Sequence, residues 1–434
     1  MGLGHSGNTL QPSVSALVVT YNSERFIQQC LQALQDSMYP ISQIAVVDNA
    51  SADNSVHVVE SNFPAVQVIR SPRNLGFAGG CNLGFPHLSG QIIALVNPDV
   101  VVRPSWLGEL VKVIVEDASV AIAGGKLLYE DGRTIQHAGA FSLYPLALSD
   151  HCGYGQLDDG RWDEQREVDY VTGAALAIRR EPLDHLGGFD EMFFPAYYEE
   201  ADLCLRARKA GWKVVYVPSA VGIHYEATSV GKYSYAHYYY FHLNRLRFVL
   251  KNYSMDQLLS DFFPAERDYL ESILPEVEIR ALCRAYADTL DYLHSQQAPA
   301  PDRTTSETEE VLFRQVDQLR RRADQISHAK SLGTTLFDVN SEINAIRLIP
   351  EPTFHSDVPV IGSLIACFRA AWNWVSTKWY VRQILQEQNE VNLRLVRCLN
   401  EMARQLAELQ HRIDTMDRNE SENSILQPTR TEDK

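Results

Sequence analysis

Acidic residues in two separate segments are the part of this sequence best suited to chemistry. The first is Asp99, which ends the Asn-Pro-Asp segment 97–99 directly after the apolar run 91–96. The second is the Glu-Glu-Ala-Asp segment 199–202, and His224 lies further along the chain. Because carboxylate and imidazole groups bind divalent cations, this set favours metal-assisted chemistry on a phosphate ester. A lone carboxylate at a strand end is also a common turn former or helix cap.

The elements expected around these residues alternate between strands and helices. Runs rich in branched apolar residues, typical of buried parallel strands, occur at 14–20, 44–48, 66–69, 91–96 and 120–125. Helix signals occur between them, near 26–34, 53–61, 76–88 and 104–116. This alternation predicts an α/β fold with a mostly parallel sheet and helices on both faces. Asp99 then follows the carboxyl end of a strand, where open α/β sheets bind ligands.

The elements expected after residue 126 are less regular. The stretch 127–167 is expected to be rich in loops, and 168–178 to return to the core. The segment 199–210 is expected to form a helix, and 212–217 a strand that ends at Pro218. An aromatic-rich helix is expected at 233–253 and would end the catalytic unit.

The composition excludes some classes of protein. The chain has 434 residues, more than one hydrophobic core usually serves, so two or three units are expected. Its formal charge of −16 argues against a nucleic-acid partner, whose binding needs Lys and Arg to replace counterions. The seven cysteines form no C-x-x-C pair, and the N-terminal stretch lacks a secretory signal. Both observations suggest reduced thiols and a cytoplasmic location.

The loops after the first two strands narrow the choice of ligand. The segment 20–22, Thr-Tyr-Asn, contains no glycine, which excludes a P-loop and a dinucleotide fingerprint at this position and disfavours an NAD-dependent enzyme. Asp48, at the end of the second strand, either accepts hydrogen bonds from a base imide or a ribose hydroxyl or caps the following helix.

Five segments, taken in order, resemble the family 2 glycosyltransferases with the GT-A fold. They are Val-Val-Thr-Tyr-Asn at 18–22, Val-Val-Asp-Asn-Ala-Ser-Ala-Asp at 46–53, Arg-Asn-Leu-Gly-Phe-Ala-Gly-Gly-Cys-Asn at 73–82, Asn-Pro-Asp at 97–99, and Tyr-Glu-Glu-Ala-Asp-Leu-Cys-Leu-Arg at 198–206. The resemblance covers residues 13–253. The Asn-Pro-Asp segment and Gly-Gly-Phe-Asp-Glu at 187–191 look most like the rhamnosyltransferase branch, and galactofuranosyltransferases are similar too.

The resemblance implies a nucleotide-sugar site at the carboxyl ends of the strands. The residues that would hold the nucleoside are Thr20, Tyr21 and Asp48. The residues that would border the sugar and its phosphates are Asn74, Gly76, Asn82, Asn97 and Asp99.

The resemblance also implies a metal, Mg²⁺ or Mn²⁺, that bridges the diphosphate. Asp99 matches the last Asp of the family's Asp-x-Asp motif, whereas Asn97 replaces the first. This replacement removes one anionic ligand and leaves a weaker carbonyl donor, so it weakens metal binding. His224 matches a metal ligand of some relatives, and its alternative is a buried, hydrogen-bonded imidazole.

An inverting transfer needs a base that deprotonates the acceptor hydroxyl, and a positioned carboxylate suits this role. The family's Glu-Asp motif places this base at its second residue, which here is Glu200. Glu is one methylene longer than Asp, so its backbone would have to be slightly withdrawn. Glu199 and Asp202 are the alternatives, and Asp202 could instead pair with Arg206 on the same helix face.

The region after residue 253 changes in character. The predicted order is a helical extension at 254–295, a linker at 296–308 and a helical segment at 309–350. An amphipathic, Trp-bearing helix at 358–380 would lie in a membrane interface or against protein, and a heptad pattern in 381–417 predicts a coiled coil. The tail 418–434 is polar and expected to be disordered.

The function expected from these features is an inverting glycosyltransferase of cell-surface polysaccharide synthesis. Its partners would be a nucleotide-diphosphate sugar, with dTDP-rhamnose favoured, a glycan or lipid-linked acceptor, and a second copy joined through the coiled coil. The protein would be cytoplasmic and peripheral on the inner face of the plasma membrane if 358–380 binds lipid. The alternative is a degenerate nucleotide-sugar-binding scaffold that acts through its C-terminal helices.

Overall fold

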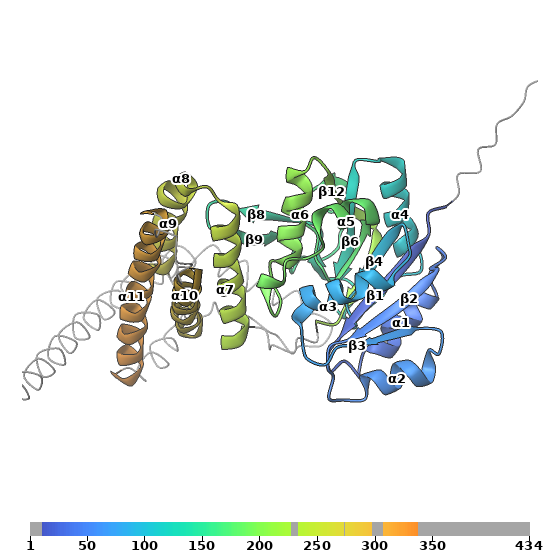
Figure 1. Cartoon of the computed structure of the whole chain (residues 1–434), viewed down its shortest axis with the longest axis horizontal. Helices are drawn as coiled ribbons and strands as arrows, with labels where there is room; N and C mark the ends of the chain where they lie inside the picture. The colour runs from blue at the N-terminus through green and yellow to red at the C-terminus, as the bar shows by residue number, and fades with distance from the viewer. Residues whose placement is uncertain (1–10, 227–232, 273, 297–306, 337–434) are drawn as a thin grey trace, which may run out of the picture. The chain divides into compact units, whose positions relative to one another are not determined.

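The computed structural model describes residues 11–226, 233–272, 274–296 and 307–336 (Figure 1). The chain divides into two compact units, Met1–Arg321 and Arg322–Lys434. Apart from the end of one helix, the description below concerns the first unit. The predicted membrane-interface helix at 358–380, the coiled coil at 381–417 and the tail at 418–434 lie outside the described residues.

Four parallel strands form the first half of the main sheet, as the sequence predicts. They are β1 (Val14–Thr20), β2 (Gln43–Asp48), β3 (Gln67–Arg70) and β4 (Ile92–Val96). β1 pairs with both β2 and β4, and β3 pairs with β2. The connecting helices are α1 (Ile27–Gln35), α2 (Ser55–Asn62) and α3 (Gly76–Gly84), the last followed by the short turn η1 (Phe85–His87). The loops after β1, β2 and β4 therefore open at one edge of the sheet.

The second half makes the sheet mixed rather than mostly parallel. After α4 (Trp106–Glu116) come β6 (Val120–Leu128), β11 (Ala175–Arg179) and β12 (Lys213–His224). β11 lies between β4 and β6 and is antiparallel to both, whereas β12 is parallel to β6. Three short strands add antiparallel pairs to this half of the sheet. β5 (Val100–Val102) and β10 (Arg166–Glu167) both pair with β12, and β7 (Ile135–His137) pairs with β6.

One expectation for this half is confirmed and one is corrected. The stretch 127–167 is rich in loops, as expected, although it also contains the hairpin of β8 (Ala140–Leu143) and β9 (Leu148–His151). The buried Lys126 anchors this excursion through ion pairs with Asp158 and Asp163. Pro218 does not end its strand, because β12 continues past it through a register shift between Val217 and Val221, where no ladder hydrogen bond is required of a proline.

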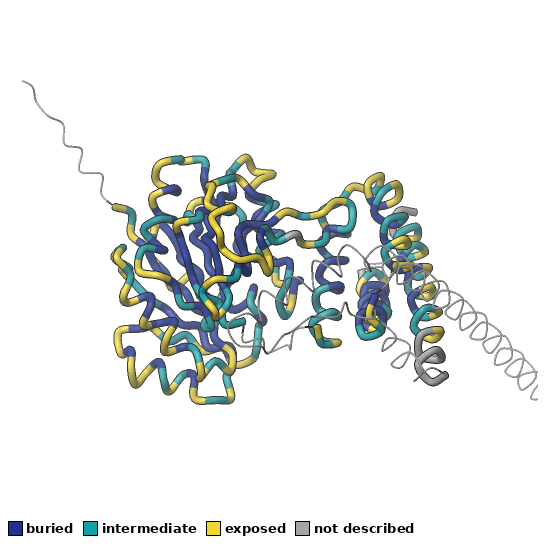
Figure 2. The backbone as a smooth tube through the Cα atoms, turned by 180° about the vertical axis from the view of Figure 1, so that it is seen from behind, coloured by how far each residue is buried: buried dark blue, intermediate teal, exposed yellow. Residues whose placement is uncertain are grey.

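Helices cover both faces of the sheet, as expected for this fold class. One core cluster joins the sheet to α1, α2 and α4. The other joins it to α3, α5 (Arg180–Leu186) and α6 (Glu199–Lys209). The strands between these helices are almost wholly buried (Figure 2). This burial on both faces explains why the strands appear in the sequence as continuous apolar runs rather than alternating ones.

The helices after residue 253 pack against α7 (Tyr235–Asn252), the aromatic-rich helix expected at 233–253. The helix α7 contacts α10 (Glu276–Gln296), and the compact unit continues to Arg321. Between them lie α8 (Met255–Gln257), the π-helical turn η3 (Leu258–Phe262) and α9 (Phe263–Leu270). The next described helix is α11 (Glu307–Leu336), in which Val316 and Leu319 are buried. No helix within the described residues is long and apolar enough to cross a membrane.

Candidate active site

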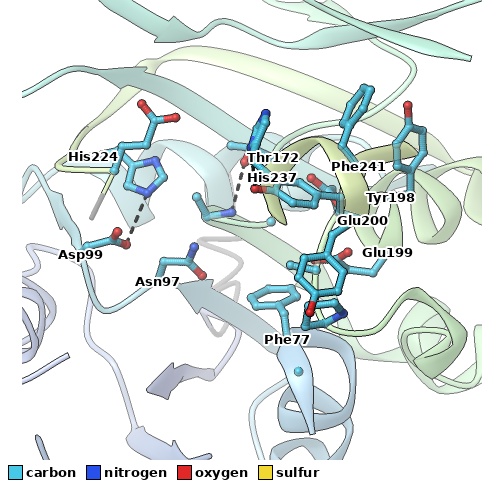
Figure 3. A pocket seen from close by; sticks show the side chains of 18 of the residues that line it. Phe77, Asn97, Asp99, Thr172, Tyr198, Glu199, Glu200, His224, His237 and Phe241 are labelled. Atoms are coloured by element: carbon cyan, nitrogen blue, oxygen red, sulfur yellow. Dashed lines mark hydrogen bonds and ion pairs between the residues drawn. The ribbon is translucent and has the colours of Figure 1, made fainter. Parts of the chain in front are cut away.

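A large cavity of about 790 Å³ opens at the carboxyl ends of β1, β2 and β4. The loops after these strands form one side. The hairpin β8–β9, the segment 195–198, the start of α6 and the first turns of α7 form the other. Both acidic segments singled out in the sequence contribute side chains to this cavity, as Figure 3 shows.

The structure brings Asp99 and His224 together. Asp99 precedes β5 and His224 ends β12, and the antiparallel pairing of these strands sets Val100 opposite His224. The Nε2 atom of His224 lies 3.3 Å from Oδ1 of Asp99 (Figure 3). On the other side of the ring, Nδ1 lies 2.8 Å from Oε1 of Gln136 and donates to it. In a neutral imidazole this leaves the Nε2 lone pair beside the carboxylate, which is the arrangement of a metal ligand pair.

Asn97 lies in the same wall of the cavity as Asp99. Its backbone N–H donates to the carbonyl of Ala174 at 2.8 Å, which ties the loop after β4 to the residue preceding β11. Its carbonyl oxygen accepts from the N–H of Val100 at 3.0 Å. The backbone of the Asn-Pro-Asp segment is therefore held at both ends, so that its side chains have fixed positions in the wall.

The two glutamates Glu199 and Glu200 begin α6 and line the cavity. The residues before them, Tyr197 and Tyr198, have φ angles of 80° and 73°, a conformation that costs free energy in non-glycine residues. Contacts hold this bend in place: Tyr198 Oη donates to the carbonyl of Ala147 at 2.7 Å, and Tyr197 Oη lies 3.0 Å from Nδ1 of His237. Backbone strain maintained by tertiary contacts is common at functional sites.

The surroundings of the two carboxyl groups differ. Within the described residues, the Oε2 atoms of both are buried and have no hydrogen-bond partner. Burial, and then the charge of Glu200, raises the pKa of Glu199 well above its ordinary value. Burial also raises the pKa of Glu200, but backbone N–H groups, including that of Gly173, oppose the rise. Glu200 therefore ionises more readily than Glu199.

Gly173 allows this close approach of backbone to carboxylate. A Cβ atom at this position would lie 3.2 Å from the ring of Phe77 and 3.6 Å from Cβ of Glu200. Without a side chain there, the backbone of residues 172–174 passes directly beside the start of α6.

Asp202 is not part of the cavity wall. Its side chain is fully buried and forms ion pairs with Nε of Arg206 at 2.7 Å and with Nζ of Lys251 at 2.8 Å. Since Lys251 belongs to α7, these contacts join α6 to α7. The structure thus gives Asp202 a structural position and leaves Glu199 and Glu200 as the candidate bases.

Residues expected to bind the donor divide into those that line the cavity and those that lie behind it. Tyr21, Asn74 and Gly76 line it. Thr20 and Asp48 are buried beneath the wall, and Asp48 accepts from the N–H of Ser51 at 3.1 Å as a local turn former does.

Asn82 also lies outside the cavity. Its amide donates to the carbonyl of Phe189 and accepts from the N–H of the same residue, at 2.9 and 3.0 Å. Asn82 therefore holds the segment 189–191 rather than a sugar. Asn49 takes its place in the wall, with Nδ2 donating to the carbonyl of Gly76 at 2.8 Å.

Sequence analysis missed the part of the site that comes from the hairpin and from α7. Its members are His137, Ser149, His151, Tyr170, His237 and Phe241. His137, Ser149, His151 and Tyr170 lie in or beside the stretch 127–167, which was expected to be rich in loops and has no helix or strand periodicity that would single them out. The aromatic members belong to the Tyr-Ala-His-Tyr-Tyr-Tyr-Phe run of α7, whose composition was the one visible signal.

Part of the chain is similar to known proteins. Residues 15–187 match the family described as Glycosyl transferase family 2. A relative in Sinorhizobium fredii, the uncharacterized protein y4gI, is 32% identical over 51% of this chain, but the match spans 25% of that protein. The N-acetylglucosaminyl-diphospho-decaprenol L-rhamnosyltransferase of Mycobacterium tuberculosis is 25% identical over 55% of this chain and 84% of its own length.

Among solved structures, S. aureus TarS 1-349 in complex with UDP-GlcNAc is 15% identical and aligns with a TM-score of 0.44 over 74% of this chain and 92% of that one. The fold assignment comes from the strand order and the family match, since both place the motif-bearing loops on the same α/β sheet. Residues 15–187, about two fifths of the chain, are therefore similar to the family 2 glycosyltransferases.

Proposed function

We propose that the protein is an inverting glycosyltransferase that moves a sugar from a nucleotide-diphosphate donor to a hydroxyl group of a glycan or lipid-linked acceptor. The observation that carries the proposal is the placement of Glu200 and of the Asp99–His224 pair in one cavity. In the proposal, Glu200 accepts a proton, while the Asp99–His224 pair faces the diphosphate.

In the proposed reaction, Glu200 accepts the proton of the acceptor hydroxyl as the oxygen attacks the anomeric carbon. The new C–O bond forms on the face opposite the nucleotide, and the bond between the anomeric carbon and the diphosphate oxygen breaks. The nucleoside diphosphate leaves with the bonding electron pair, and the proton remains on Glu200. Burial and the charge of Glu200 raise the pKa of Glu199 well above its ordinary value, so Glu199 ionises less readily and is the weaker candidate for this role.

The charge of the leaving diphosphate requires a cation. Among the described residues that line the cavity, Arg25 is the only lysine or arginine. The Asp99 carboxylate and the Nε2 lone pair of His224 suit Mg²⁺ or Mn²⁺, whose remaining ligands would be diphosphate oxygens and water. A bound ion would supply electrostatic stabilisation of the leaving group. No group of three or more His, Cys, Asp or Glu side chains in the described residues could hold a metal without substrate.

A deoxyhexose donor, dTDP-rhamnose, is proposed because the M. tuberculosis relative, which is aligned over most of its length, is named an L-rhamnosyltransferase. The diphospho-decaprenol in that relative's name supports a lipid-linked acceptor. The similarity to a protein named O-antigen biosynthesis protein RfbC, from Myxococcus xanthus, supports a place in cell-surface polysaccharide synthesis.

The test is a panel of dTDP-rhamnose, UDP-GlcNAc, UDP-galactofuranose and GDP-mannose, with Mn²⁺ or Mg²⁺ present. We expect release of nucleoside diphosphate from one of them, fastest for dTDP-rhamnose, and loss of release when EDTA is added. Turnover of a different donor would overturn the rhamnose proposal but keep the glycosyltransferase. Binding of a nucleotide sugar without any turnover would favour the scaffold alternative.

A further inference from the structure

The segment 193–198 connects two parts of the cavity. In its middle, the carbonyl of Pro195 accepts a hydrogen bond of 2.9 Å from the backbone N–H of Phe77, in the first turn of α3. At its end, Tyr198 directly precedes α6, whose second residue is Glu200. Both Phe77 and Glu200 line the cavity (Figure 3). A shift of this segment therefore changes the position of the glutamate relative to the first turn of α3, where the donor sugar is expected.

Gly76 sets how closely the segment approaches α3. Its φ angle is 71°, and a Cβ atom at this position would lie 2.7 Å from the carbonyl oxygen of Pro195. An L side chain would strain the backbone and displace that carbonyl. The hydrogen bond between Phe77 and Pro195 thus depends on a close approach of two backbones, and it fixes the middle of the segment at the start of α3.

A single amide side chain of α7 also holds this segment. Nδ2 of Asn244 donates to the carbonyl of Phe193 at 3.0 Å and to that of Ala196 at 2.7 Å. The carbonyl of Phe194 lies 3.5 Å from the same nitrogen. The two shorter bonds use both hydrogens of the amide. Asn244 is wholly buried and is not among the described residues that line the cavity, so it acts from behind the wall.

Arg247, one helical turn further along α7, fixes the orientation of this amide. Its Nη1 atom donates to Oδ1 of Asn244 at 3.0 Å and to the carbonyl of Met192 at 2.6 Å. Because a guanidinium group only donates, the amide turns its oxygen toward Arg247 and its NH2 group toward the carbonyls. A carboxylate in place of the amide would set a second oxygen against those carbonyls, so this position requires a donor.

We propose that Asn244 is a positioning residue for catalysis, which holds the segment 193–196 and thereby sets the place of Glu200 relative to the donor. The inference rests on the proposed function, in which Glu200 is the base, and adds a residue that acts without touching substrate. The physical link is the bend at Tyr197 and Tyr198, whose φ angles of 80° and 73° persist only when contacts on both sides maintain them. When the carbonyl of Ala196 is released, the bend relaxes and the start of α6 moves.

The first test variant is Asn244→Asp, which keeps the shape of the side chain and replaces the donating NH2 group with an oxygen. The second is Arg247→Met, which keeps an apolar stem and removes the bond that orients the amide, and it decides the test if Asn244→Asp does not fold. The matched control is Val249→Ala, which shortens a wholly buried side chain of the same helix that is not among the described lining residues.

The first measurement does not need turnover. It is hydrogen–deuterium exchange of the Phe77 amide, followed by mass spectrometry of the peptide that contains it. We expect this amide, which is bound to Pro195, to exchange about tenfold faster in Asn244→Asp and also faster in Arg247→Met than in the wild type. The rate should be unchanged in Val249→Ala.

The second measurement is the kcat for release of nucleoside diphosphate under saturating donor. We expect it to fall about tenfold or more in Asn244→Asp, because the base is displaced, while the affinity for nucleoside diphosphate with Mn²⁺ stays unchanged. The acid limb of the pH profile of kcat should also move to higher pH, since Glu200 leaves the backbone N–H groups that oppose the rise of its pKa. Partial unfolding would reduce the amount of active protein without moving this limb.

Unchanged exchange of the Phe77 amide in both Asn244→Asp and Arg247→Met, or faster exchange with wild-type kcat, would overturn the positioning role. An equal fall of kcat in Val249→Ala would overturn it too, because the loss would then follow from stability alone. Faster exchange in Asn244→Asp, together with a wild type that turns over no donor, would refute the proposed function and leave Asn244 as the residue that holds the segment.

Discussion

Two adjacent glutamates occupy the same cavity, and their environments assign them different roles. Backbone N–H groups favour the ionised form of Glu200, whereas Glu199 is more fully buried and faces the charge of its neighbour. Where carboxyl groups are close, the one with more hydrogen-bond donors loses its proton first. This difference makes Glu200 the stronger candidate for the base.

Replacing Glu200 with Gln should lower sugar transfer about a hundredfold or more, because the isosteric amide cannot accept the acceptor proton. Donor binding should persist, since the amide keeps the shape of the side chain. The measurement is the transfer rate under saturating donor, with Glu199→Gln as the matched control. If Glu199→Gln loses the activity and Glu200→Gln keeps it, the assignment of the base is wrong.

Glu199 gives a prediction for stability. The pKa of Glu199 in the folded protein is raised above its ordinary value of 4.5. The contribution of Glu199 to the free energy of unfolding is therefore complete below about pH 4.5 and is lost as the pH rises through the folded pKa. Gln cannot ionise, so Glu199→Gln should melt at a higher temperature than the wild type at about pH 8, with the difference shrinking toward about pH 4.5. A difference that is independent of pH would show that Glu199 does not titrate in this range.

Asp99→Ala should abolish transfer and the dependence of donor binding on Mn²⁺, because the diphosphate would lose its link to the protein through the metal. Isothermal titration of the nucleoside diphosphate with and without Mn²⁺ measures this directly. His224→Gln should retain part of the dependence, since the carboxylate remains. Wild-type turnover in Asp99→Ala would remove Asp99 from the site.

At the scale of elements, the helical extension supports the cavity through α7. Arg245, which binds the hairpin carbonyl of Leu146, forms a wholly buried ion pair with Glu266 of α9. Tyr286 of α10 donates to the same carboxylate. The hairpin is thus connected to helices that lie outside the part of the chain that matches the family.

Glu266→Gln should therefore destabilise the protein by about 3 kcal/mol, because it leaves the Arg245 charge buried and incompletely paired. Although burial raises the pKa of Glu266, the charge and hydrogen bonds of Arg245 hold it below its ordinary value. A depressed pKa contributes stability that is present above the unfolded pKa and lost as the pH falls through the folded one. The difference in unfolding free energy between the wild type and Glu266→Gln, measured with urea, should accordingly be largest at neutral pH. A difference that is the same at all pH values would argue against the ion pair as its cause.

At the scale of the whole molecule, the segment from 358 onward is predicted to position the enzyme rather than to perform chemistry. A chain that ends near residue 350 should still hydrolyse donor, but should lose self-association and lipid binding if the heptads pair and the Trp-bearing helix binds an interface. Sedimentation and liposome retention of both lengths measure this. If the full and shortened chains sediment equally and are retained equally by liposomes, both the self-association and the lipid-binding roles are refuted. If only the liposome retention is equal, the lipid-binding role is refuted and the coiled coil remains.

The sequence by itself determined the strand and helix order of the first half and the motifs that make residues 15–187 similar to the family 2 glycosyltransferases. Continuous apolar runs mark strands buried on both faces, and the motif order is written along the chain, so neither depends on distant contacts. The same is true of the acidic pair that opens α6, because its position follows from local helix signals.

Only the tertiary structure decided which of the marked residues share the cavity. Asp202 is turned toward Lys251, and Asn82 toward the 189–191 segment, because of partners that are distant in sequence. His224 reaches Asp99 through the pairing of β5 with β12, which no local pattern encodes. The walls formed by the hairpin and α7 likewise depend on long-range packing, since the segments that build them are about a hundred residues apart and meet through contacts such as that of Arg245 with the carbonyl of Leu146.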